Sequence, residues 1–150
     1  MIYTYLLSPV FVTSSHHQYS SPIFRIDTRP VFVKTRYAEV ESYVTKDGCE
    51  IRELIHPKAH GNRNQSFAEA TIKPGQKTAL HCHHLTEEIY HFTRGSGVMT
   101  LGGERLDVKA GDTVLIAAGT PHCVENTGRG RLKILCACSP PYSHDDTLLI

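Results

Sequence analysis

The chain has 150 residues, with 16 lysines and arginines against 15 aspartates and glutamates, for a formal net charge of +1. This length allows one domain with a hydrophobic core that needs no disulfides. The balanced charge offers no basic surface for nucleic acid or for an anionic membrane. An apolar run at the start is broken by Pro9 and is too short to span a bilayer. We expect a cytoplasmic protein that binds neither nucleic acid nor membrane.

Five cysteines are spread along the chain without any C-x-x-C pair. The odd number and this spacing argue against a disulfide framework and against a cysteine-rich zinc module, and they fit reduced thiols. Cys136 and Cys138 are two residues apart, so on a strand they share one face. We interpret them as small buried side chains rather than as a redox pair or a metal site.

The first 30 residues differ from the rest of the chain. The sequence TSSHHQYSSP at positions 13–22 is polar and rich in turn-forming residues. We therefore predict a loosely ordered N-terminal arm over residues 1–30, followed by a folded domain with a C-terminal tail over residues 31–150. An arm that lies on a neighbouring subunit is the alternative.

From position 37 onward, short apolar runs alternate with turn signals that contain Gly, Pro, Asn or Asp. No long segment keeps an apolar stripe at helical spacing. Gly102–Gly103 separates two such runs, which is a signal for a tight hairpin. The pattern predicts an all-β sandwich or barrel. The predicted strands span residues 39–45, 51–55, 66–73, 78–83, 88–93, 97–101, 104–108, 113–117, 122–125 and 132–138.

The segment HCHHLTEE, which begins at His81, and a separate His122 carry the strongest functional signal. His81 and His83 are two residues apart, so on a strand they point to the same face. A carboxylate from Glu87 or Glu88 follows closely, and His122 can return on a second strand. Three imidazoles and one carboxylate at one point form a site for a first-row transition metal.

The order and spacing of these residues resemble the two sequence motifs of the cupin superfamily. The first motif reads G, five residues, H-x-H, three or four residues, E, six residues and G. In this chain it runs from Gly75 to Gly95. The gap of six residues before Gly95 favours Glu88 over Glu87 as the acidic residue of the motif.

The second cupin motif reads G, five residues, P-x-G, two residues, H, three residues and N. Here it runs from Gly111 to Asn126, and Ala117 stands in place of the proline. The resemblance extends over about residues 66–139, roughly half of the chain. The resemblance implies a small jelly-roll β-barrel that binds one divalent metal in its mouth. The metal ligands that it implies are His81, His83, Glu88 and His122.

Strand parity separates the neighbours of the expected ligands into two faces. Tyr90 has the parity of Glu88, so we expect it to line the barrel. It is our candidate for a catalytic group, because its hydroxyl could hydrogen-bond a metal-bound ligand. His84 and His91 have the opposite parity and are expected at the surface or rim. The polar run His144–Asp145–Asp146 is expected to belong to a mobile, solvated terminus.

Three imidazoles and one carboxylate leave two positions open on an octahedral ion, which suits Fe, Mn, Ni or Zn. We expect a metal-dependent enzyme for a small oxygenated metabolite such as a sugar or sugar phosphate, with isomerase-like chemistry. An iron-dependent dioxygenase and a non-catalytic ligand-binding or sensory cupin are the alternatives. Edge strands and the apolar arm favour a homodimer.

Overall fold

The structure, a computed structural model, describes residues 32–150. The arm predicted over residues 1–30 lies outside this range. Nearly all regular structure in the described residues is β-strand, and the predicted all-β jelly-roll barrel is confirmed. Within the same residues, no helix has the length and apolar character needed to cross a membrane.

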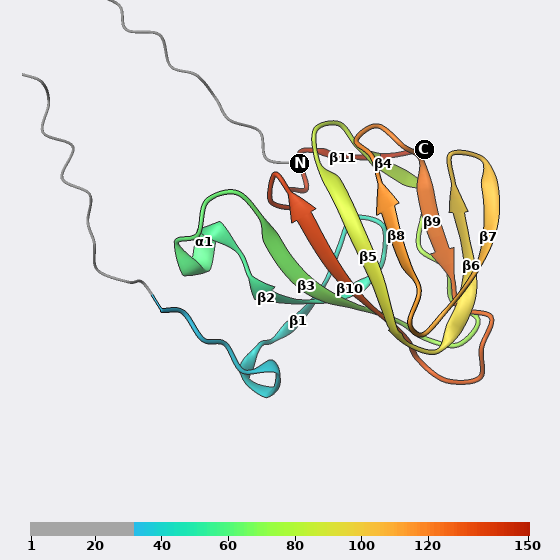
Figure 1. Cartoon of the computed structure of the whole chain (residues 1–150), viewed down its shortest axis with the longest axis horizontal. Helices are drawn as coiled ribbons and strands as arrows, with labels where there is room; N and C mark the ends of the chain where they lie inside the picture. The colour runs from blue at the N-terminus through green and yellow to red at the C-terminus, as the bar shows by residue number, and fades with distance from the viewer. Residues whose placement is uncertain (1–31) are drawn as a thin grey trace, which may run out of the picture. The chain divides into compact units, whose positions relative to one another are not determined.

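Two antiparallel sheets make up the barrel (Figure 1). A short helix, α1 (Pro57–His60), connects two strands of the first sheet, and a 3-10 turn, η1 (Tyr37–Glu39), precedes the first strand. In spatial order, the six-stranded sheet contains β1 (Ser42–Val44), β2 (Glu50–Ile55), β3 (Ser66–Ile72), β10 (Leu132–Ser139), β5 (Glu87–Arg94) and β8 (Thr113–Ile116). The five-stranded sheet contains β11 (Thr147–Leu149), β4 (His81–His83), β9 (His122–Glu125), β6 (Ser96–Leu101) and β7 (Glu104–Lys109).

Alternation along β10 shows how the sequence selects the inner face of the barrel. Leu132, Ile134, Cys136 and Cys138 are buried, whereas the residues between them are only partly buried. The five cysteines form no disulfide, as predicted, and their thiols are free. The core side chains with the least exposure are Phe92, Met99, Leu132, Ile134, Ile116 and Val124.

The predicted hairpin at Gly102–Gly103 is confirmed between β6 and β7. Gly102 has φ +56° and Gly103 has φ +97°, and Leu101 pairs with Glu104 directly across the turn. Two consecutive positive φ angles are the signature of a type I′ turn, which only glycine adopts without strain at both positions. The two glycines therefore fix the register of this strand pair.

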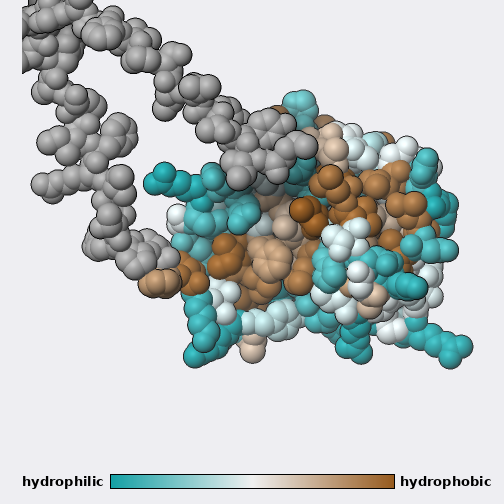
Figure 2. Space-filling model, viewed as in Figure 1, coloured by the Kyte–Doolittle hydropathy of each residue, from teal (hydrophilic) through white to brown (hydrophobic). Residues whose placement is uncertain are grey.

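A row of apolar side chains crosses the outer face of the six-stranded sheet (Figure 2). Phe67 on β3 pairs with Ala137 on β10, Ala137 pairs with Ile89 on β5, and Ile89 pairs with Leu115 on β8. Phe67, Ile89 and Leu115 are all exposed. Because the strands are in register, these side chains form one continuous apolar surface.

The C-terminal segment corrects part of the prediction of a mobile, solvated terminus: His144 and Asp145 are exposed, but Asp146 and the strand after it are held against the barrel. Strand β11 pairs with β4, so that Thr147 stands opposite His83. The two carboxylate oxygens of Asp146 accept backbone hydrogen bonds, from Leu85 at 2.9 Å and from Thr86 at 3.0 Å. The prediction was wrong for Asp146 because this polar side chain satisfies backbone donors of a neighbouring turn.

Strand β4 is shorter than the predicted run 78–83. The N–H of Thr78 donates to the carbonyl of Val124, and the N–H of Ala79 donates to the carbonyl of Asp47. This stretch therefore bonds to two different segments instead of following one neighbouring strand. The regular ladder is left with the three residues that carry the H-x-H motif.

Candidate metal centre

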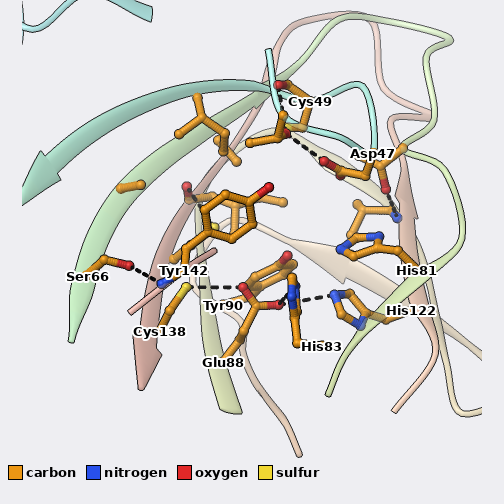
Figure 3. A pocket seen from close by; sticks show the side chains of 18 of the residues that line it. Asp47, Cys49, Ser66, His81, His83, Glu88, Tyr90, His122, Cys138 and Tyr142 are labelled. Atoms are coloured by element: carbon orange, nitrogen blue, oxygen red, sulfur yellow. Dashed lines mark hydrogen bonds and ion pairs between the residues drawn. The ribbon is translucent and has the colours of Figure 1, made fainter. Parts of the chain in front are cut away.

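The four predicted ligands come together at one point inside the barrel (Figure 3). His81 and His83 project from β4, and His122 on β9 pairs with His81. Glu88 reaches the same point from β5 in the other sheet. One ligand atom from each side chain lies within 4.8 Å of the others, and all four residues are buried. Two sheets thus contribute to one cluster of metal-ligating types.

Two of the imidazoles use Nδ1 for a hydrogen bond that points away from the centre. Nδ1 of His81 lies 2.9 Å from the carbonyl oxygen of Ala79, and Nδ1 of His122 lies 2.9 Å from that of Thr120. A carbonyl oxygen can only accept, so each neutral ring carries its proton on Nδ1. Both Nε2 atoms therefore present a lone pair to the centre, as a metal ligand must.

The imidazole of His83 also carries its proton on Nδ1, because of a hydrogen bond to a side chain of β11. Nδ1 of His83 lies 3.3 Å from the hydroxyl oxygen of Thr147. That hydroxyl donates its proton to the carbonyl oxygen of Ser143 at 2.8 Å. The hydroxyl oxygen is therefore an acceptor toward His83, whose ring proton lies on Nδ1 and whose Nε2 is free.

The unpartnered atoms of the cluster fit a bound divalent cation. Oε2 of Glu88 lies 3.2 Å from Nε2 of His83 and 3.1 Å from Nε2 of His122. Oε2 of Glu88 and Nε2 of His122 are buried, yet neither has a hydrogen-bond partner among residues 32–150. Buried polar atoms without partners are costly. Ligands bound at ~2.1 Å around one octahedral ion lie about 3.0 Å apart, close to the observed spacing.

The charges within the cluster depend on one another. Burial alone would raise the pKa of the Glu88 carboxyl group, but His122 and His83 outweigh it and hold that pKa well below its usual range. Burial lowers the pKa of His83, but the adjacent Glu88 carboxylate raises it by a larger amount, so the net change is upward. Burial and the neighbouring His122 lower the pKa of His81. At neutral pH the centre therefore holds one carboxylate charge and at least one neutral imidazole.

The neighbours of the cluster lie where strand parity placed them. Tyr90 lines the cavity, and its ring centre is 5.9 Å from that of His122. His84 and Glu87 are exposed, so Glu88 alone supplies the carboxylate of the cluster. His91 does not line the cavity.

The sequence analysis missed several side chains around the centre. Tyr43 and Glu53 come from the first two strands, and Tyr142 comes from the segment before β11. Cys138, predicted as packing only, contacts Glu88 as well as being buried. Spacing along the chain could not reveal these residues, because long-range strand pairing places them. Alternation on β2, which groups Glu53 with the buried Ile51, was the one available signal.

A cavity of about 570 Å³, including its opening to solvent, adjoins the four clustered residues. Much of its wall is apolar, and this part is formed by Ile51, Ala68, Ala70, Ile72, Val124 and Ile134. The arrangement is thus a metal-ligating cluster on the wall of a largely apolar, open pocket.

Comparison with known proteins agrees with this arrangement. The cupin-domain family model matches residues 68–138, a span that includes all four clustered residues. The chain is also 50% identical over 118 residues to the uncharacterized protein MJ1618 of Methanocaldococcus jannaschii, covering 79% of this chain and 94% of that protein. The chain belongs to the cupin family.

A sequence match and a structure match from Thermotoga maritima extend the comparison. An oxalate-binding protein is 34% identical to this cupin over 90 residues, which cover 60% of the cupin and 74% of that protein. A crystal structure of a predicted oxalate decarboxylase superposes with a TM-score of 0.64 at 30% identity, covering 72% of the cupin and 99% of that chain. The structural match supports the jelly-roll fold, and the cluster of His81, His83, Glu88 and His122 is the site that could hold a metal ion.

Proposed function

We propose that this cupin is a metal-dependent enzyme that acts on a small oxygenated metabolite, such as a sugar, by isomerase-like chemistry. The supporting observation is the convergence of three imidazoles and the Glu88 carboxylate beside an open cavity. Mixed nitrogen and oxygen ligands of this kind suit Fe, Mn, Ni or Zn. When bound, such an ion polarises a carbonyl group or holds two adjacent hydroxyl groups.

Tyr90 is the residue that we propose to hold a proton for the reaction. Its side chain borders the cavity beside His122. Burial, together with the negative charge of Glu88, raises the pKa of Tyr90 well above its usual value. The phenol therefore stays protonated at neutral pH, and it would donate a hydrogen bond to a substrate oxygen rather than remove a proton.

Two other activities would use the same side chains. An iron-dependent dioxygenase would use the positions that the four ligands leave open for substrate and oxygen. A ligand-binding cupin without turnover is supported by the relative from Thermotoga maritima, which is described as an oxalate-binding protein. Oxygen uptake would favour the dioxygenase, and tight binding without any product would favour the binding protein.

Elemental analysis of protein purified without a metal-affinity column tests the metal centre. We expect about one equivalent of a single transition metal, lost in the His122→Ala variant. Glu87→Gln is the matched control, because Glu87 is exposed beside the clustered Glu88, and it should keep the metal. Absence of metal from the unmodified protein, even after anaerobic reconstitution, would contradict the proposal.

We also propose that the cupin forms a homodimer through the apolar row of Phe67, Ala137, Ile89 and Leu115. A continuous exposed apolar surface of this kind favours association with a second surface. Light scattering after size exclusion should give twice the chain mass for the unmodified protein and a single chain mass for Ile89→Glu. A single chain mass for both proteins would contradict the dimer.

A further inference from the structure

A second polar group of side chains, which we call the Tyr43–Glu53–Tyr142 group, borders the same cavity as the metal centre. Glu53 lies on β2, and Glu88 lies on β5. In the sheet order β2-β3-β10-β5 they are three strands apart. At ~4.8 Å per strand this separation is about 14 Å of sheet. A molecule that fills the cavity can therefore contact both groups at once.

Glu53 has one satisfied and one unsatisfied oxygen. The hydroxyl of Tyr43 donates to Oε2 of Glu53 at 2.9 Å. Oε1 of Glu53 is buried and has no hydrogen-bond partner among the described residues, and the same is true of the Tyr142 hydroxyl. Burial raises the pKa of Glu53, against the opposing effect of the Tyr43 hydrogen bond. The group thus lacks at least one donor that a ligand could supply.

The backbone of Tyr142 is fixed on both sides. Its N–H donates to the hydroxyl oxygen of Ser66 at 3.0 Å, and its carbonyl oxygen accepts from Nε2 of His56 at 3.1 Å. The side chain extends into the cavity (Figure 3), where its ring centre is 5.8 Å from that of His83. Tyr142 is therefore held where its hydroxyl can meet a ligand that also reaches the metal centre.

The charge of the cavity restricts what such a ligand can carry. Among the described residues, no lysine or arginine lines the cavity, whereas Asp47, Glu53 and Glu88 do. A phosphate or a free carboxylate at this end would find no lysine or arginine in the cavity wall to pair with and would face the like charge of Glu53. The basic groups that act on Glu53 are the imidazoles of His56 and His60, which do not line the cavity. An ammonium group could satisfy Glu53, but it has no acceptor for the Tyr142 proton. A hydroxyl group can donate to Glu53 Oε1 and accept from Tyr142.

We propose that the Tyr43–Glu53–Tyr142 group binds a hydroxyl group of an uncharged, polyhydroxylated substrate whose other end reaches the metal centre. The inference rests on the proposed function only for the contact between the substrate and the metal centre. It narrows the substrate class to neutral sugars, polyols and catechols, and it excludes sugar phosphates. Glu53 and Tyr142 then determine specificity, while the four clustered residues carry the chemistry.

Equilibrium dialysis of the metal-loaded cupin against a defined mixture tests the inference. The mixture pairs each neutral compound with a charged derivative: fructose with fructose 6-phosphate, mannose with mannose 6-phosphate, glucose with glucosamine, and catechol with protocatechuate. Mass spectrometry measures which compounds are retained. We expect retention of neutral compounds, reduced at least about tenfold in Glu53→Gln and in Tyr142→Phe. Glu104→Gln, an exposed change of the same kind, should retain them fully.

Preferred retention of phosphate esters, acids or glucosamine by the unmodified cupin would overturn the inference, and so would retention of no compound at all. Retention of the neutral compounds by Glu53→Gln at the level of the unmodified cupin would also overturn it. The metal content of each preparation separates this inference from the proposed function. Neutral compounds retained by His122→Ala but lost in Glu53→Gln would support the hydroxyl site and contradict a metal-dependent substrate contact. A loaded metal centre, together with unchanged retention in Glu53→Gln, would support the metal centre of the proposed function and contradict the hydroxyl site. Thermal melting of each variant shows that the comparison is between folded proteins.

Discussion

The thiol of Cys138 donates a hydrogen bond to Oε1 of Glu88 at 3.2 Å. The two residues stand opposite each other because β10 pairs with β5 in this register. Glu88 directs its other oxygen, Oε2, toward the imidazoles of His83 and His122. Burial, followed by the Glu88 charge, raises the pKa of Cys138, so the thiol stays protonated and remains a donor. Cys138 therefore fixes the orientation of the carboxylate within the cluster.

Replacing Cys138 should weaken metal binding without abolishing it. Cys138→Ala removes the donor to Oε1, so the carboxylate gains freedom to rotate, and we expect a loss of metal affinity of up to about tenfold because a thiol is a weak donor. Cys138→Ser keeps a donor and should stay close to the unmodified protein. Competition with a metal chelator measures both affinities. Equal affinity for all three proteins would show that the thiol has only a packing role.

Thr147 should affect the metal centre through the orientation of His83. Thr147→Val keeps the branched shape but removes the acceptor for Nδ1 of His83, so we expect metal affinity to fall about tenfold or more. Thr147→Ser keeps the hydroxyl and should restore most of the affinity. The same chelator competition gives the values. If Thr147→Val bound metal as tightly as the unmodified protein, this hydrogen bond would have no part in preparing the ligand.

The stability of the metal-free fold and the affinity for metal should change in opposite directions as pH rises. The raised pKa of His83 means that its charged pairing with Glu88 stabilises the metal-free fold fully below the usual value of 6.5, and this contribution is lost as pH rises through the raised pKa. Metal binding needs the neutral imidazole, so affinity should rise over that same interval.

Measurements of metal affinity and of stability to chemical denaturation, made at pH values between 6.5 and the raised pKa of His83, check the two trends. Glu88→Gln removes the charge that raises the pKa of His83 and should flatten the denaturation trend. Metal affinity that does not change with pH would show that no proton is displaced from His83.

Asn126 should be a main determinant of stability near the second cupin motif. The side chain is 0% exposed. Its amide nitrogen donates to the carbonyl oxygens of Ile72 at 2.7 Å and Gly130 at 2.8 Å, and its oxygen accepts from the N–H of Gly128 at 2.9 Å. Asn126→Ala removes one buried partner, that of the Ile72 carbonyl, and two partly buried ones, those of Gly128 and Gly130, so we expect a loss of about 2–4 kcal/mol in the free energy of unfolding.

Urea denaturation of Asn126→Ala gives this loss directly. Asn64→Ala is the control, because the Asn64 side chain is exposed, and it should change stability by less than about 0.5 kcal/mol. A loss of that small size for Asn126→Ala as well would indicate that water replaces the lost partners.

The clustered residues were predictable because their signal is local. His81 and His83 share a face by strand parity, Gly95 ends the strand that carries Glu88, and the turn at Gly119 precedes the strand that carries His122. The buried alternation of β10 was predictable for the same reason. Periodicity and turn chemistry are properties of neighbouring residues, so one sequence is enough to read them.

The missed features depend on contacts between distant segments. The run His144–Asp145–Asp146 was predicted to be a solvated terminus because it is polar, yet the carboxylate oxygens of Asp146 accept hydrogen bonds from the backbone N–H groups of Leu85 and Thr86. Glu53 was passed over because a carboxylate on a short strand is usually at the surface. Its inward position depends on the pairing of β2 with β3, including a register shift between Glu53 and Ile55. Composition alone carries no information about such pairing.

Strand β11 has only three residues and lies at the edge of its sheet, so we expect it to open readily in local fluctuations. Each opening breaks the hydrogen bond between Thr147 and His83, so the His83 imidazole is no longer held in its orientation. By thermodynamic linkage, an ion that binds only the closed form must hold the strand in place. Release of the ion would then follow the fraying of β11, and the amide of His84, which donates to Asp146, would exchange with solvent more slowly once the ion is bound.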